Sequence, residues 1–153
     1  MADSIREKIL DNMETVLNTV TQAAGYEVTL QRVFRVPLSP FDSPMYPYAQ
    51  LVDVGEALAD GRDQPVWFST WNLQVLIGVG NDEYIDASKR ANMILASVHK
   101  ALSVDPKRGG YAIDTTIIAN RLILNDETMP FGGGELTAVI LYRHRLGDPY
   151  TQV

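Results

Sequence analysis

The stretch 66–80, VWFSTWNLQVLIGVG, constrains the fold of this chain more than any other part of the sequence. Large apolar side chains alternate with smaller or polar ones along it, which is typical of a strand with one buried face. Fifteen residues of strand reach about 50 Å, whereas a domain of 153 residues has a diameter of roughly 40 Å. The strand is therefore expected to bend at a bulge near Ser69–Thr70, or to leave the compact body as an arm that needs a partner. The apolar face predicted for it consists of Trp67, Trp71, Leu73, Val75, Ile77 and Val79.

Two amphipathic helices accompany this strand. The first begins with the capping-box pattern Ser4–Glu7 and keeps apolar residues at helical spacing as far as Val20. The second follows the carboxylates at 82–86, and its apolar stripe ends at Leu102, before Pro106. Each helix has a polar back, so each is expected to pack by one face only.

Shorter apolar alternations predict four more strands, and the segment 55–65, GEALADGRDQP, reads as a polar loop. The resulting order is α-β-β-β-α-β-β. It predicts a single α+β domain over residues 1–153, with a mixed, largely antiparallel sheet of long strands and both helices on one face. The four additional strands are expected at 28–36, 48–54, 112–124 and 135–146.

Two loops carry apolar side chains that neither helices nor strands account for. Residues 37–48, PLSPFDSPMYPY, hold four of the eight prolines and can form neither a helix nor a central strand. Residues 129–134, MPFGGG, place methionine and phenylalanine beside three glycines that permit a change of shape. Each loop either folds back as a lid over the sheet or docks on a neighbouring protein, because Met, Phe and Tyr are favoured in interfaces. The candidate interface residues are Phe41, Met45, Tyr46, Tyr48, Met129 and Phe131.

Charge and composition exclude several classes of function. The 19 acidic residues outweigh the 13 basic ones for a net charge of −6, which disfavours general binding to nucleic acid or to anionic membranes. The absence of cysteine excludes disulfides and thiolate chemistry. The first residues lack the apolar core of a signal peptide, and no apolar run is long enough to span a membrane. We therefore expect synthesis in a cytoplasm.

Candidate metal and acid–base residues are few. His99 and His144 are far apart, without a second ligand at metal spacing, and are expected at the surface. Carboxylates at Asp82, Glu83 and Asp86 would suit a divalent cation, but the free amides at the start of a helix already explain them. The acidic loop around Asp53, Glu56, Asp60 and Asp63 lacks the spacing of an EF-hand and is expected to be a solvated turn.

Phosphate-binding and nucleophile motifs also fail. Gly78-Val79-Gly80 precedes a helix, but Glu83 stands where a dinucleotide-binding turn has its third glycine. The basic turn Lys107–Gly110 is expected to complement the end of the second helix rather than to bind an anion. No serine lies in a G-x-S-x-G context. We therefore expect no enzymatic activity, no catalytic residue, no metal and no cofactor.

The order of segments resembles that of the tail terminator, or tail-completion, proteins of long-tailed bacteriophages. The shared features are an amphipathic opening helix, SIREKILDNMETVLNTV, and a proline-rich loop that leads into YAQLVDVG. A tryptophan-bearing strand, WFSTWNLQVLIGV, is followed by an acidic turn and the helix DASKRANMILASVHKAL. The turn KRGG, a strand pair and the ending LYRHRLGDPY complete the pattern over nearly the whole chain.

This resemblance implies a small α+β subunit that closes into a ring of six. The ring would cap the finished tail tube, end its polymerisation and join the tail to the head. The implied partners are further copies of the chain, the tail tube protein and a head-completion or connector protein. Genomic DNA would pass through the lumen without specific binding, which an acidic subunit favours. The implied location is the virion, at its tail or neck.

Three alternatives stay open. A head-completion or connector ring protein would have similar sequence features. A small metal-dependent hydrolytic or ligand-binding domain would use the acidic turn at 82–86. A nucleic-acid-binding module is disfavoured by the net charge.

Overall fold

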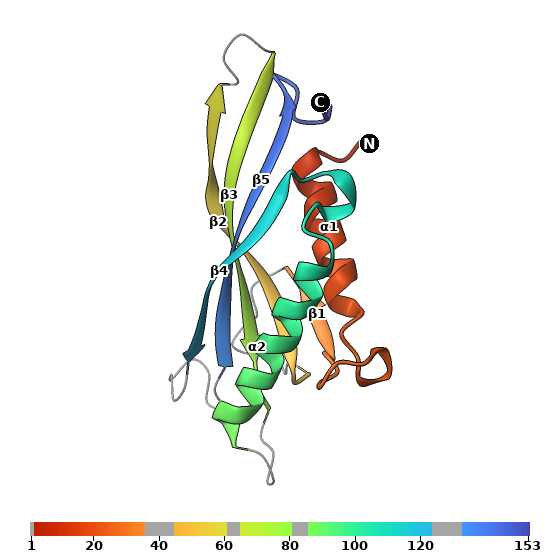
Figure 1. Cartoon of the computed structure of the whole chain (residues 1–153), viewed down its shortest axis with the longest axis vertical. Coiled ribbons are helices and arrows are strands. Elements are labelled where there is room, and N and C mark those ends of the chain that lie inside the picture. Colours follow the sequence, from red (N-terminus) through yellow and green to blue (C-terminus); the bar gives the residue numbers. More distant parts are fainter. Residues whose placement is uncertain (1, 36–44, 61–64, 81–85, 124–132) are drawn as a thin grey trace.

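The structure is a computed structural model, and it describes residues 2–35, 45–60, 65–80, 86–123 and 133–153. It consists of a five-stranded sheet with two helices on one side (Figure 1). The elements are α1 (Ile5–Asn18), η1 (Gln22–Ala24), β1 (Arg32–Phe34), β2 (Tyr48–Asp60), β3 (Val66–Gly78), α2 (Ala87–Val104), η2 (Arg108–Gly110), β4 (Asp114–Ile123) and β5 (Gly133–Arg145). The predicted α+β class is confirmed.

The sheet is mixed but largely antiparallel, in the order β1-β2-β3-β5-β4. Only the short β1 runs parallel to its neighbour, and it pairs with β2 at Tyr48, Ala49 and Gln50 alone. At the centre, β3 pairs with β5 without interruption from Val66 to Gly78. Strands β2, β3 and β5 have 13 residues each and lie side by side in the sheet, and the predicted long strand is confirmed.

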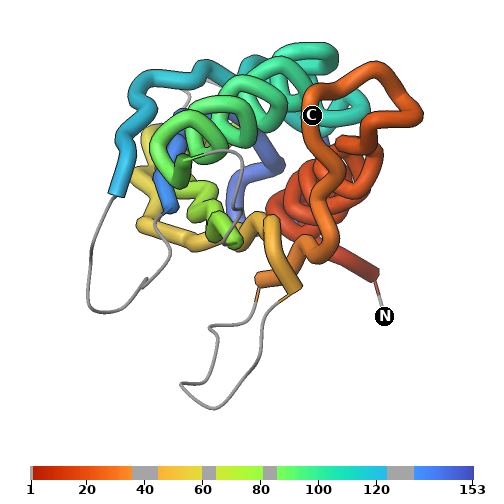
Figure 2. Tube along the Cα trace, turned by 90° about the horizontal axis from the view of Figure 1, so that it is seen from below, coloured from red at the N-terminus to blue at the C-terminus, as the bar shows by residue number. Residues whose placement is uncertain are grey.

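Both helices lie on the same side of the sheet, as the view along the long axis shows (Figure 2). Helix α2 lies over β3, β4 and β5, while α1 packs against α2 and β1. Ser4 caps α1 by accepting the Glu7 amide, as the capping-box pattern predicts. The apolar stripes of both helices and the odd-numbered side chains of β3 from Trp71 onward join in one core, which includes Ile9, Met13, Trp71, Leu73, Ile94 and Val98.

The structure differs from the predicted strands at three places. Strand β2 continues through 55–60, where the sequence predicts a loop, because pairing with β3 outweighs the poor strand propensity of these residues. Of the segment predicted as a strand over 28–36, the structure describes residues 28–35, and among these only Arg32–Phe34 form a strand, although Val28 and Leu30 are buried in the core as their alternation indicates. The bulges lie at Val54 in β2 and at Ile118 in β4, and β3 has none at Ser69–Thr70.

Three strands form an arm, which we define as residues 57–60 of β2, 66–70 of β3 and 141–145 of β5. Strand β4 begins at Asp114, opposite Leu141, so only three strands continue beyond this level. The upper ends of β2, β3 and β5 extend past the N-terminal end of α1 (Figure 1). Of the two expected solutions for an overlong strand, the chain therefore adopts the arm.

A substitution at Gly78 measures how tightly the side chains pack at the end of the sheet opposite the arm. A Cβ atom on Gly78 would overlap the ring of Tyr48, which is 5% exposed. We expect Gly78→Ala to lower the free energy of unfolding by about 1–3 kcal/mol, since the ring must leave its position. Urea unfolding should show this loss reduced when Tyr48→Ala is also present. An additive double substitution would contradict the packing described here.

Candidate interaction surface

Of the six predicted interface residues, three lie in the described part of the chain, and Phe41, Met129 and Phe131 lie outside it. Met45 is 59% exposed and free to contact another protein. Tyr46 is half-buried and stacks at 5.5 Å on Tyr48. Tyr48 also meets Phe34 at 5.4 Å and covers Gly78, so its ring packs within its own chain and not on the surface predicted for it. Small residues opposite these rings, Gly78 and Gly80, make room for them.

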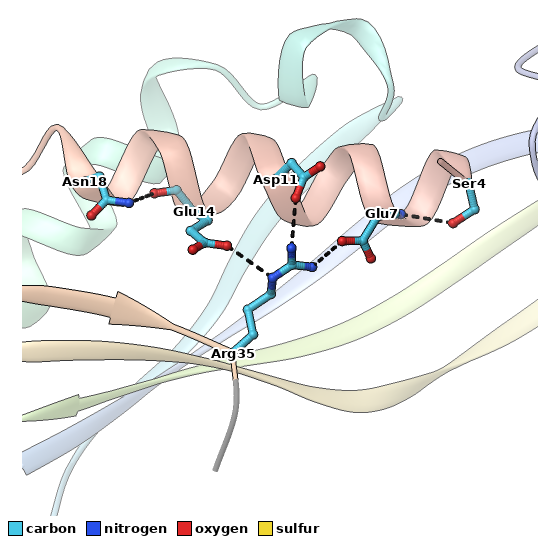
Figure 3. A network of polar contacts seen from close by, with 6 residues as sticks. All are labelled: Ser4, Glu7, Asp11, Glu14, Asn18 and Arg35. Atoms are coloured by element: carbon cyan, nitrogen blue, oxygen red, sulfur yellow. Dashed lines mark hydrogen bonds and ion pairs between the residues drawn. The ribbon is translucent and has the colours of Figure 1, made fainter. Parts of the chain in front are cut away.

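Arg35, the last described residue before 36–44, is bound by three carboxylates of α1 (Figure 3). Its Nη1 donates to Glu7 at 2.6 Å, its Nη2 to Asp11 at 2.8 Å and its Nε to Glu14 at 3.1 Å. Spacings of four and three residues put these carboxylates on one helix face. Burial opposes the charged guanidinium, but the hydrogen bond and charge of Glu7 and the charges of Glu14 and Asp11 outweigh it and raise the pKa of Arg35. The network fixes the end of β1 against α1.

Removal of Arg35 should expose the repulsion among its three partners. We expect Arg35→Ala to cost about 1 kcal/mol of unfolding free energy at low salt, because the groups are partly exposed. The loss should shrink in high salt, which screens the repulsion. Arg32→Ala is the matched control, since Arg32 is exposed and no described carboxylate pairs with it, while its guanidinium lies over the Phe34 ring. Equal losses for both variants in urea unfolding at two salt concentrations would contradict this account.

A polar cluster lies where the arm joins the body. The Glu56 carboxylate accepts the Ser69 hydroxyl at 2.7 Å and the Tyr142 hydroxyl at 2.5 Å. Burial and then the hydrogen bond to Glu56 raise the pKa of Tyr142, which therefore stays protonated and donates. These residues come from β2, β3 and β5, so the cluster connects all three strands of the arm. The sequence does not predict this cluster, because Glu56 is expected from it in a solvated turn.

Arg6 connects this cluster to α1. It pairs with Asp53, lies 3.6 Å from Glu56 and stacks over the Trp71 ring at 4.5 Å. The buried Trp71 in turn donates its indole N–H to Asp53 at 2.9 Å. A guanidinium between two carboxylates and an aromatic ring gains an ion pair with the carboxylates and a cation–π contact with the ring. The first turn of α1 is thus held at the base of the arm.

A pocket of 510 Å³ opens beside this cluster, under the arm. Its apolar wall includes Leu58, Trp67 and Pro149, and Leu58 is 52% exposed. His144, which the sequence places at the surface, is only 7% exposed and lines the pocket. This correction follows from the strand register, which turns His144 to the same face as Tyr142. Its Nδ1 lies 2.8 Å from the Arg145 carbonyl and so carries the proton.

The acidic turn before α2 is described only at Asp86, because Asp82 and Glu83 lie outside the described residues. Asp86 caps the helix by accepting the Lys89 amide at 2.8 Å, as its position at a helix start predicts. In the described ranges, no three His, Asp or Glu side chains come together as a metal site would require. His99 is half-buried, 3.3 Å from the Asn120 amide.

The basic turn differs from its prediction at one residue. Arg108 is fully buried and donates to the Leu102 carbonyl, so it complements the last turn of α2 from inside the protein. Burial lowers the pKa of its guanidinium, and the charge of Asp105 opposes this. The amides of Gly109 and Lys107 point to the Asp105 carboxylate at 2.6 and 3.0 Å. Asp105 therefore takes the place that a bound anion would have.

Asp105 gives the fold a defined dependence on pH. The Gly109 amide, followed by that of Lys107 and the charges of Arg108 and Lys107, lowers the pKa of Asp105 below its usual value of 3.8. Between these two pKa values the unfolded chain binds more protons than the folded chain. The stabilisation of the fold by the Asp105 carboxylate is therefore complete above the pKa of Asp105 in the unfolded chain, and it is lost as pH falls through its pKa in the folded chain. We expect Asp105→Asn to lower Tm by a few degrees at pH 7 and to match the parent chain at pH 2. A difference that persists at pH 2 would contradict the linkage.

The face of the sheet opposite the helices carries few charges along its central strands. The outward side chains of β3 are all uncharged, and no described helix covers them. In β5 the charges stand near the ends, at Glu135, Arg143 and Arg145, with Thr137, Val139 and Leu141 between them. Phe68 and Leu141 are 37% and 39% exposed there. The outward residues of β3 are Phe68, Thr70, Asn72, Gln74 and Leu76.

Comparisons with known proteins give no family. The chain matches no model of a protein family, and a search of curated proteins finds no similar sequence. Among the described helices, none is both long and apolar enough to cross a membrane.

Proposed function

We propose that this chain is a structural subunit that assembles into a ring, caps the tail tube of a long-tailed bacteriophage and joins the tail to the head. The observation that carries the proposal is the arm. Three strands continue past the helices and leave Leu58 and Phe68 exposed on its two faces. A three-stranded extension gains stability when a partner covers its apolar side chains.

The proposed role is structural rather than catalytic. Several polar groups that line the pocket already have partners within the chain: Tyr142 donates to Glu56, Arg6 pairs with Asp53, and His144 Nδ1 donates to the Arg145 carbonyl. Tyr142 is a poor nucleophile, because burial and Glu56 keep it protonated. The cluster therefore favours a mechanical role, in which it holds the arm at a fixed angle to the body.

The order of segments supports the phage assignment through its resemblance to tail terminator proteins. The proposed partners are further copies of this chain in a ring of six, the tail tube protein and a head-completion or connector protein. The net charge of −6 suits a lumen through which genomic DNA slides without binding, because like charges repel. The proposed location is the tail or neck of the virion, after synthesis in the host cytoplasm.

Electron microscopy of the purified chain tests this proposal. We expect negative-stain images to show closed rings, and rings at one end of tubes when tail tube protein is added. Phe68→Ser should weaken assembly while circular dichroism stays unchanged, because Phe68 is exposed on the arm. Val104→Ser is the control, since Val104 is 75% exposed at the end of α2. A chain that stays monomeric at high concentration and leaves tubes uncapped would overturn the proposal.

A further inference from the structure

The sheet has two edges along which no described residue pairs. Strand β1 accompanies β2 only as far as Gln50, so among the described residues no strand pairs with the outer edge of residues 51–60, which we call the open edge of β2. Strand β4, residues 114–123, is the last strand on the other side. An open edge presents unpaired N–H and C=O groups to another strand. The two open edges are equally long and run in opposite directions, because three antiparallel pairings separate β2 from β4.

Each open edge has a bulge, and both bulges present an exposed aliphatic side chain. Val54 is 56% exposed at the bulge of β2, and Ile118 is 57% exposed at the bulge of β4. Both bulges adjoin the same row of the sheet, in which Asp53, Leu73, Ala138 and Ile117 lie side by side. Val54 and Ile118 lie on opposite sides of this row, because β2 and β4 run in opposite directions. A rotation about an axis along the strands therefore brings the bulge of one copy to within two residues of the bulge of the next.

We propose that β2 of one subunit pairs antiparallel with β4 of the next, with Val54 packed against Ile118 of the neighbouring copy. This inference rests on the proposed ring and names the contact that builds it. In this register residues 51–58 lie opposite residues 121–114. The register requires a shift of two residues from the common row, and a stagger of this kind is what closing a sheet into a ring needs.

The bulges make the two open edges complementary to each other. A bulge on one edge alone protects it, because a regular strand cannot follow the extra residue. Bulges on both edges place one extra residue opposite the other, so pairing continues on either side. Aliphatic side chains at the point where the ladder is interrupted then exclude water from it.

Charge favours the contact between unlike edges over two-fold contacts. Residues 51–60 contain Asp53, Glu56 and Asp60 and no basic residue, a formal charge of −3, of which the pairing with Arg6 compensates one. Two such strands side by side would repel. Residues 114–123 contain Asp114 and Arg121 and are neutral. Pairing β2 with β4 keeps acidic strands apart and gives a head-to-tail contact, which closes by rotation.

Cysteine cross-linking tests the contact, because the chain has no cysteine of its own. Directly opposed residues of an antiparallel pair are about 4.5–5.5 Å apart at Cα, within reach of a disulfide. Under mild oxidation, a mixture of Val54→Cys and Ile118→Cys chains should give several-fold more dimer than either chain alone. The doubly substituted chain should give a ladder that ends at the order of the ring. Val54→Cys mixed with Val104→Cys is the control and should not link.

The outcomes separate this contact from the proposed function. Closed rings in the microscope without the mixed disulfide overturn the edge contact and leave the function standing. The mixed disulfide in chains that form open filaments, or that never cap tubes, supports the contact and overturns the function. Self-linking of Val54→Cys alone overturns the contact in favour of a two-fold dimer.

A charge exchange gives a second measurement without cysteine. Val54→Lys should reduce assembly in sedimentation velocity, because a lysine at an edge disfavours pairing with another strand. Ile118→Glu on the same chain should restore assembly, since lysine and glutamate then face each other between subunits. Both positions are exposed, so circular dichroism should show an unchanged fold. Failure of Ile118→Glu to restore assembly overturns the contact.

Discussion

The uninterrupted ladder between β3 and β5 is the interaction on which the rest of the structure depends. It joins residues 66–78 to 133–145, so segments from the middle and the end of the chain form the centre of the sheet. On one face its alternating apolar side chains receive α2. At one end it continues beyond the helices and creates the arm. A ladder of this length makes the domain longer than its helices can cover, and this mismatch exposes the surfaces from which we infer assembly.

The polar cluster where the arm joins the body shows how one bulge changes which side chains of β2 face the helices. Before the bulge, Ala49, Leu51 and Asp53 of β2 face the helices. After it, Glu56 and Leu58 take that face, because the extra residue at Val54 shifts the alternation by one. Glu56 therefore reaches Ser69 and Tyr142 instead of solvent. The same bulge turns an acidic side chain inward and an aliphatic one, Val54, outward at the edge.

Prediction from sequence succeeds where buried residues recur with the period of a helix or strand, and it fails where pairing with a distant strand determines the local structure. The apolar stripes of α1, α2 and β3 are recovered from spacing alone, and so is the fold class. The strand character of 55–60 is missed, because Gly55, Glu56 and Asp60 have low propensity and only the ladder with β3 imposes it. His144 and Arg108 are misplaced for a related reason, since a strand register and a turn conformation bury them. The sequence also does not predict that Arg35 binds Glu7, Asp11 and Glu14, although their spacing does predict that these three carboxylates share one helix face.

Open sheet edges and a fixed arm place different demands on the same subunit. An edge that pairs with a neighbour must keep its twist, since adjacent strands in a sheet are rotated by a regular amount. Arg6, held by Asp53 and stacked on Trp71, ties α1 to the residue that precedes the bulge of β2. Arg35 ties the same helix to the end of β1, on the other side of the point where the open edge begins. Helix α1 thus holds the beginning of the open edge, through Asp53 of β2 and through the residue that follows β1. A rigid edge loses less entropy on pairing than a mobile one, so these two arginines would favour the assembly that we propose, although neither lies in the proposed contact.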